Sequence, residues 1–212
     1  MQPESLSNII SDPFFIPLLV VLLLISIITF SYADFSNGFI KNLAGQIPNR
    51  NNLITSKFIV IGIHNFIFLV VGFVSRIIGG YAGSAFGQEI KIDALIPAAF
   101  ATLLIKWMLT MAIGAILLFL TTAVRNKTLA SIVGVIIGTG ALGLVYMGLD
   151  MALANIFGKN SISVSSIAPD QLLSNVSVGE NVAVLNAIIV SIVCSVIFFS
   201  LTIKVFKTRD IK

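Results

Sequence analysis

Five long apolar stretches, almost free of charge, are the feature that most constrains this chain. Each contains 20 to 28 residues, and a helix of roughly 20 residues crosses the hydrocarbon core of a bilayer. The apolar runs are continuous and lack the alternation of barrel strands, so they predict helices. We therefore expect an all-α integral membrane protein, a single domain over residues 1–212 with five transmembrane helices. The predicted spans are residues 14–33, 58–78, 97–124, 129–149 and 182–203.

Composition supports this class and excludes others. The chain is 57% hydrophobic and 10% charged, whereas a soluble domain contains about 25% charged residues. A soluble enzyme, a nucleic-acid-binding protein and a disordered chain are excluded, and membrane lipid is the expected surroundings. Cys194 is the only cysteine, so the chain contains no internal disulfide.

The distribution of charge predicts the orientation. Segments 1–13, 79–96 and 150–181 must share one side of the membrane, and they contain two basic and seven acidic residues. The segments on the other side contain nine basic and two acidic residues. Because cytoplasmic loops are rich in Lys and Arg, we predict that the N-terminus lies outside and the C-terminus in the cytoplasm.

Two connecting segments have features of their own. Segment 34–57 is basic, and its apolar residues are spaced to line one face of a short helix ending near Pro48. It is either a connector that lies along the membrane or a helix that binds a soluble partner. Segment 150–181 contains 32 residues with several apolar clusters. A loop of that length usually has its own structure, so we expect short helices at the outer interface.

Three ionisable side chains lie within the predicted spans. For His64, the only histidine, a hydrogen bond between helices is favoured over a proton relay, because no carboxylate lies deep in a span. Arg76 and Lys106 lie near the outer ends of their spans, where long side chains extend to the interface. The alternative is that both line an outer vestibule for anionic groups.

Two glycines in the fourth predicted span and the absence of catalytic and metal-binding motifs also bear on function. Gly134 and Gly138 have the spacing that lets two helices approach closely, within the chain or between two copies. No phosphate-binding loop, metal-ligand cluster or Ser-His-Asp set occurs in the sequence. We therefore expect no catalytic residue, no metal site and no cofactor in this chain.

Residues 34–60 resemble a recurring segment of bacterial permeases of the ABC-2 exporter class. The third and fourth spans form a tight hairpin, a long outer segment precedes the last span, and the tail is basic. The resemblance therefore extends over essentially the whole chain. The matching positions are Asp34, Asn37, Gly38, Ile40, Lys41, Asn42, Leu43, Pro48, Arg50 and Lys57.

This resemblance implies a half-transporter in the bacterial plasma membrane. Two permease subunits, identical or paired with a sibling, would work with two separate ATPase subunits that bind ATP and magnesium. Segment 34–57 would contain the coupling helix that contacts the ATPase. Family cargoes include antimicrobial peptides, lantibiotics and hydrophobic drugs, so such proteins confer resistance to antimicrobial peptides. The charge-poor spans fit a hydrophobic or amphipathic cargo.

The resemblance implies a permease with six spans, and this chain matches the second to the sixth of them. Either this chain is a five-span variant or a further span lies upstream of Met1, and the N-terminus outside favours the upstream span. The main alternative function is a non-transporting immunity or assembly protein that binds other helices through its glycine-rich face. A secondary transporter is disfavoured because the spans lack carboxylates.

Overall fold

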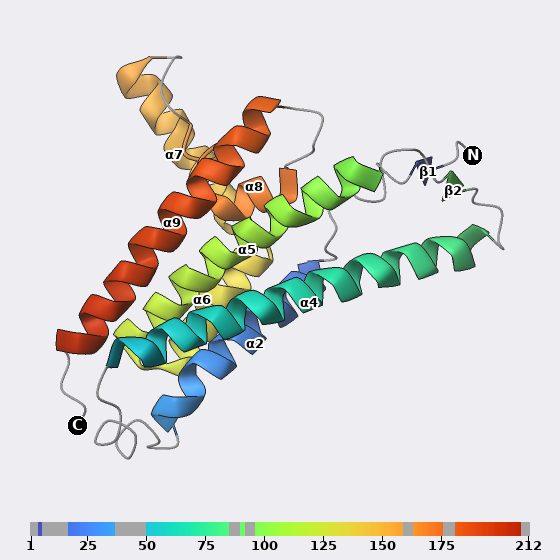
Figure 1. Ribbon diagram of the computed structural model, residues 1–212. Helices are drawn as coiled ribbons and strands as arrows, with labels where there is room; N and C mark the ends of the chain where they lie inside the picture. Colours follow the sequence, from blue (N-terminus) through green and yellow to red (C-terminus); the bar gives the residue numbers. More distant parts are fainter. Residues whose placement is uncertain are drawn as a thin grey trace.

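The computed structural model describes residues 4–5, 17–36, 50–84, 90–91, 96–158, 163–175 and 181–208. Apart from two short strands, its elements are helices, which confirms the prediction of an all-α membrane protein for the described residues (Figure 1). The elements are β1 (Glu4–Ser5), α2 (Pro17–Ser36), α4 (Arg50–Ser84), β2 (Ile90–Lys91), α5 (Ile96–Val124), α6 (Lys127–Gly138), α7 (Leu142–Phe157), α8 (Pro169–Asn175) and α9 (Asn181–Thr208).

Three described helices, α4, α5 and α9, are long and apolar enough to cross a membrane. The helices α6 and α7 together would supply a fourth span if the bent pair is one span. Helix α2 contributes a shorter apolar stretch, Leu19–Ala33. These helices overlap all five stretches expected from the sequence, and α4 extends beyond its predicted range at both ends.

The range predicted as the fourth span, 129–149, covers two helices instead of one. Helices α6 and α7 are bent by 70° at their junction, and α7 projects away from the bundle (Figure 1). The 12 residues of α6 rise only about 18 Å, less than the roughly 30 Å of a hydrocarbon core. Neither the length nor the apolar composition of the range revealed this break.

A glycine at the end of α6 explains the bend. Gly140 has a positive φ of 71°, a conformation that glycine adopts without steric cost. The Gly140 amide donates to the Ile137 carbonyl, and the Ala141 amide donates to the Ile136 carbonyl. This pair of bonds is the Schellman motif, which ends a helix and turns the chain.

The start of α6 is equally well defined. Helices α5 and α6 are joined by Arg125 and Asn126 alone. The side chain of Asn126 accepts hydrogen bonds from the amides of Thr128 and Leu129. Asparagine is a preferred N-cap because it satisfies amides that have no partner within the helix. This cap makes α5 and α6 a tight helical hairpin.

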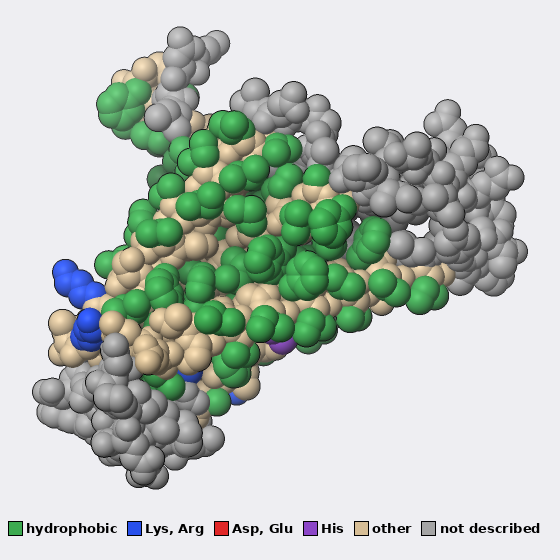
Figure 2. Space-filling view, viewed as in Figure 1, with side chains coloured by type: hydrophobic (Ala, Val, Ile, Leu, Met, Phe, Trp, Pro, Cys, Tyr) green, Lys and Arg blue, Asp and Glu red, His purple; other side chains and the backbone are tan. Residues whose placement is uncertain are grey.

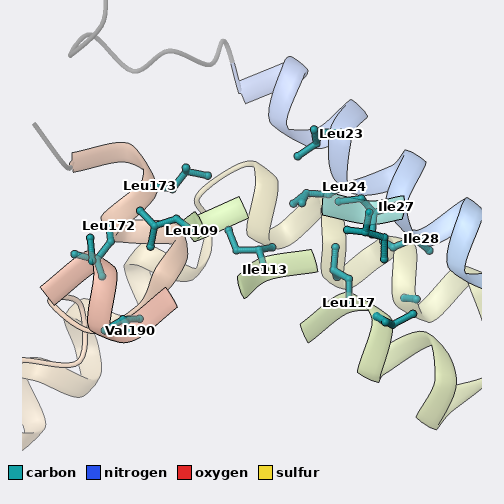
Figure 3. Packing of buried hydrophobic residues seen from close by; sticks show 14 of the residues in the cluster. Leu23, Leu24, Ile27, Ile28, Leu109, Ile113, Leu117, Leu172, Leu173 and Val190 are labelled. Atoms are coloured by element: carbon teal, nitrogen blue, oxygen red, sulfur yellow. The ribbon is translucent and has the colours of Figure 1, made fainter. Parts of the chain in front are cut away.

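One apolar core joins α2, α4, α5, α6, α8 and α9 (Figure 3). Helix α5 is the central element. In its most apolar 18-residue stretch 56% is buried inside the structure, against 22% for the corresponding stretch of α4 and 17% for that of α9. In Figure 3, Ile113 and Leu117 of α5 lie beside α2, whereas Leu109 lies beside α8. The exposed faces of α4 and α9 are strongly apolar, which suits contact with lipid.

Charged side chains separate toward the two ends of the bundle. Figure 2 shows Lys and Arg side chains gathered at the end where α9 finishes, while the described acidic side chains, Asp150 and Asp170, belong to α7 and α8. At that second end β1 pairs in parallel with β2, which joins the N-terminal segment to the α4–α5 connection. The sequence predicted that these two segments lie on one side. The basic side chains described away from that second end are Lys57, Arg125, Lys127, Lys204 and Lys207.

Candidate functional site

The segment expected to couple to an ATPase joins α2 to α4 at the basic end of the bundle (Figure 1). Its central part, residues 37–49, lies outside the described residues, and so do Gly38, Lys41, Asn42, Leu43 and Pro48. Asp34 belongs to the last turn of α2 and Arg50 is the first residue of α4, but their side chains are likewise outside the description. Lys57 is the one predicted site residue of this segment whose side chain is described.

Lys57 contacts α2 directly. It lies two turns into α4, and only 6% of its surface is exposed. Its ammonium donates a hydrogen bond of 2.7 Å to the backbone carbonyl of Ser31 and lies 5.9 Å from the centre of the Phe30 ring. A cation at that distance from an aromatic face is attracted by the ring electrons. Lys57 therefore holds the start of α4 against the end of α2.

A second group of polar contacts lies deeper in the bundle, where α4 faces α2 and α5. The His64 Nε2 atom is 3.4 Å from the Ser26 hydroxyl of α2, and the ring stacks on Phe68. The Asn65 amide, fully buried, donates to the Thr110 carbonyl of α5 at 3.1 Å. The His64 contact is of the interhelical kind that the sequence favoured.

Trp107 adds a further contact between α5 and α4. Its indole N–H donates to the Gly62 carbonyl at 2.9 Å, and its ring packs edge-on against Phe66. We call these contacts the polar seam: Ser26, Gly62, His64, Asn65, Trp107 and Thr110. Burying polar groups in an apolar bundle is costly unless they are hydrogen-bonded, so the seam fixes how the three helices fit together.

The sequence places Arg76 and Lys106 near the outer ends of their spans. The structure describes the side chain of Lys106 but not that of Arg76. Lys106 is only 2% exposed on α5, so it does not extend to the surface of the bundle as the sequence suggested. The alternative that Lys106 lines an outer vestibule stays a prediction. The Arg76 side chain lies outside the described part of α4.

Gly134 and Gly138 are buried and face α2. A Cβ atom at Gly138 would lie 3.0 Å from the Val21 Cα atom, and one at Gly134 would lie 2.6 Å from the Ile28 Cδ1 atom. At Gly138 the close atoms belong to the Val21 backbone, so this glycine is needed for the present approach of α6 to α2, whereas at Gly134 the flexible end of the Ile28 side chain could shift. They therefore serve packing within the chain.

The sequence did not single out a cluster around Asp150 at the opposite end. Its carboxylate accepts hydrogen bonds from the hydroxyls of Ser163 and Ser165, both at 2.7 Å, and from the Val164 and Ser165 amides. Asp170 similarly accepts from the Tyr146 hydroxyl at 3.2 Å. These two carboxylates attach the segment 163–170 to α7. The signal was the run of residues 161–165, in which serines alternate with Ile162 and Val164.

The geometry defines a helical multi-pass membrane protein in which one basic segment connects two adjoining helices of the bundle. A family model described as ABC-2 family transporter protein matches residues 2–141. The match covers more than half of the chain, and the chain belongs to the ABC-2 transporter family. A comparison with curated proteins found no match.

Membership in this family defines the general function of the chain. The chain is a membrane permease component of an ABC transporter, a transport component and not itself a catalytic one. The family also implies partnership with ABC ATPase subunits. The matched residues contain the whole of segment 34–57, the polar seam and both packing glycines. They end at the junction between α6 and α7.

Proposed function

We propose that this chain is the permease subunit of an ATP-driven exporter that moves a hydrophobic or amphipathic cargo across a bacterial plasma membrane. The observation that carries the proposal is the family match over residues 2–141, which includes a basic connection between two packed helices. Antimicrobial peptides, lantibiotics and drugs are the cargo classes we favour. The apolar described helices suit such cargo, because a strongly charged solute would need more polar partners along its path.

The basic end would face the cytoplasm, as the excess of Lys and Arg predicts. There, segment 34–57 would couple to the ATPase, with Lys57, only 6% exposed, inside the bundle at its base. The residues of the segment that would contact the ATPase are Asp34, Gly38, Lys41, Asn42, Leu43, Pro48 and Arg50. The ATPase would bind ATP and magnesium, and this chain would supply the path for the cargo. A second permease subunit, identical or related, would complete the transporter.

The experiment is co-purification. The tagged chain is expressed in its native host and purified in detergent, and any ABC ATPase retained with it is identified and quantified. The test variant carries Lys41→Glu and Arg50→Glu, which reverse two charges of the segment. The matched control carries Lys204→Glu and Lys207→Glu, because these exposed lysines lie on α9 at the same end of the bundle.

We expect the wild-type chain and the α9 control to retain the ATPase, and the segment variant to lose it. Cells that express the intact pair would then survive higher concentrations of an amphipathic peptide or drug from a test panel. A wild-type chain that purifies without an ATPase would contradict the proposal. It would favour the alternative of a non-transporting immunity or assembly protein.

A further inference from the structure

Lys57 is unusual because a charged group is buried between two apolar residues of its helix face. Ile54 and Ile61, one turn before and one turn after it on the same face, are 2% and 1% exposed. Burying an ammonium costs several kcal/mol unless good partners replace its water. A leucine or methionine would pack in this position without that cost. The position therefore calls for a specific role of the charge.

The described hydrogen bond of Lys57 indicates this role. The bond to the Ser31 carbonyl joins the last turns of α2 to the first turns of α4. These are the two helix ends between which segment 34–57 is connected. A backbone carbonyl is a fixed acceptor, since it moves only if the helix moves. The bond therefore closes the connection into a loop at its base.

A second contact lies further along the same pair of helices. Ser26 and His64 approach each other about one to two turns deeper in the bundle. Because α2 and α4 run in opposite directions, an earlier residue on α2 faces a later residue on α4. Two contacts at different depths restrain both the separation and the relative tilt of two helices. Trp107 and Asn65 then join α4 to α5.

We propose that Lys57 is the positioning residue that makes α2 and α4 move as one body when the ATPase displaces segment 34–57. The inference rests on the proposed function. Without the bond, a displacement of the segment is absorbed where the two helix ends separate. With it, the displacement passes to both helices and through the polar seam to α5.

The test measures the distance between α2 and α4 in the complex with the ATPase. Spin labels are attached to Thr29→Cys and Thr55→Cys, two exposed positions on these helices, in a chain that carries Cys194→Ala. Distances are recorded by pulsed electron paramagnetic resonance, without nucleotide and with ATP trapped by a hydrolysis-deficient ATPase. The variants are Lys57→Met, Lys57→Arg and the control Lys204→Met.

In the wild-type chain, Lys57→Arg and the control, we expect one narrow distance that is unchanged when ATP binds. In Lys57→Met we expect the ATPase still to bind and the distance to lengthen only in the ATP-bound complex. Lys57→Gln, which keeps a donor without the charge, replaces the methionine variant if that variant does not fold.

Two results would overturn the inference. One is a Lys57→Met complex with the wild-type distance in both nucleotide states. The other is a distance that broadens equally with and without ATP, which would make the bond a purely structural one. If the wild-type chain retains no ATPase, the proposed function itself fails, and the coupling role of Lys57 fails with it.

Discussion

The bundle of α2, α4, α5, α6 and α9 and the arm formed by α7 are both built from strongly apolar sequence, yet they are held in different ways. In the bundle, side chains donate to backbone carbonyls of neighbouring helices, and glycines bring α6 close to α2. Helix α7 buries none of its own residues. Its large side chains are exposed, as Leu144 at 79% and Ile156 at 72% show.

The difference shows that an apolar composition indicates a membrane environment but does not indicate how closely a helix packs against its neighbours. The arm is held by carboxylates, through Asp150 and Asp170, which fix a polar segment and leave the apolar face of α7 open. Backbone-directed bonds restrain whole helices, whereas these carboxylate bonds restrain a short loop. Substitutions in the bundle should therefore change global stability, and substitutions in the arm should act locally.

Gly138→Ala is expected to have the largest effect. The new Cβ would meet the backbone of Val21, 3.0 Å from its Cα and 3.1 Å from its nitrogen, so α6 must move away from α2. Overpacking of this kind costs about 1–3 kcal/mol of unfolding free energy. The measurement is unfolding by sodium dodecyl sulfate in mixed micelles, followed by circular dichroism.

Two other glycines provide the comparison. Gly134→Ala should cost less than Gly138→Ala, because the contact there is the flexible end of the Ile28 side chain. Gly148→Ala on α7 meets nothing within 4 Å among the described residues. It should be neutral or stabilising by up to about 1 kcal/mol, since alanine favours helix more than glycine does. Equal losses at Gly138 and Gly148 would contradict the packing we describe.

Trp107→Phe is expected to cause the next largest loss of unfolding free energy. It removes the bond to the Gly62 carbonyl and some packing volume while leaving an aromatic ring. Hydrogen bonds between membrane helices contribute about 0.6 kcal/mol on average, and the lost volume adds to this, so we expect about 1–2 kcal/mol. Phe100→Leu, at a position 57% exposed, is the control and should change little. A loss at Phe100 equal to that at Trp107 would argue against the polar seam.

Much of the helical framework was predictable, because long charge-poor stretches leave few structures open to a chain. The family was predictable from segment 34–60, because its spacing and its position between two spans resemble the family even though its residue identities match only loosely. Both predictions depend on patterns along the sequence. The roles of Gly134 and Gly138 were only half predictable: their spacing indicated a close approach, but only the structure identifies α2 as the partner.

The contacts themselves were not predictable, since each joins residues distant in sequence. Lys57 resembled any lysine at the start of a span, and its burial depends on the position of Ser31. Lys106 was expected to extend to the interface and is instead 2% exposed. The break after α6 could have been predicted, because Gly138-Thr139-Gly140 places a glycine where a Schellman motif needs one.

Tyr146→Phe tests the arm with a smaller change. It removes the hydrogen bond to Asp170 and keeps the ring. A hydrogen bond of this kind contributes about 0.5–1.5 kcal/mol, and partial exposure places this one near the lower end. We expect faster amide hydrogen exchange in α8 and little change in unfolding of the bundle, measured by mass spectrometry and detergent titration. A loss as large as that of Trp107→Phe would show that the arm is part of the cooperative core.

Asp150→Ala should have the most local effect. The carboxylate accepts from two hydroxyls and two amides of residues 163–165, so its removal frees this loop from α7. Amide exchange of Val164 and Ser165 should become faster, while exchange in α2, α4 and α5 stays as in the wild-type chain. Asp150→Asn keeps one acceptor oxygen, so its amide exchange rates at Val164 and Ser165 should lie between those of the wild-type chain and those of Asp150→Ala. Faster exchange throughout the bundle would erase the distinction between arm and bundle, because it would mean that both unfold together.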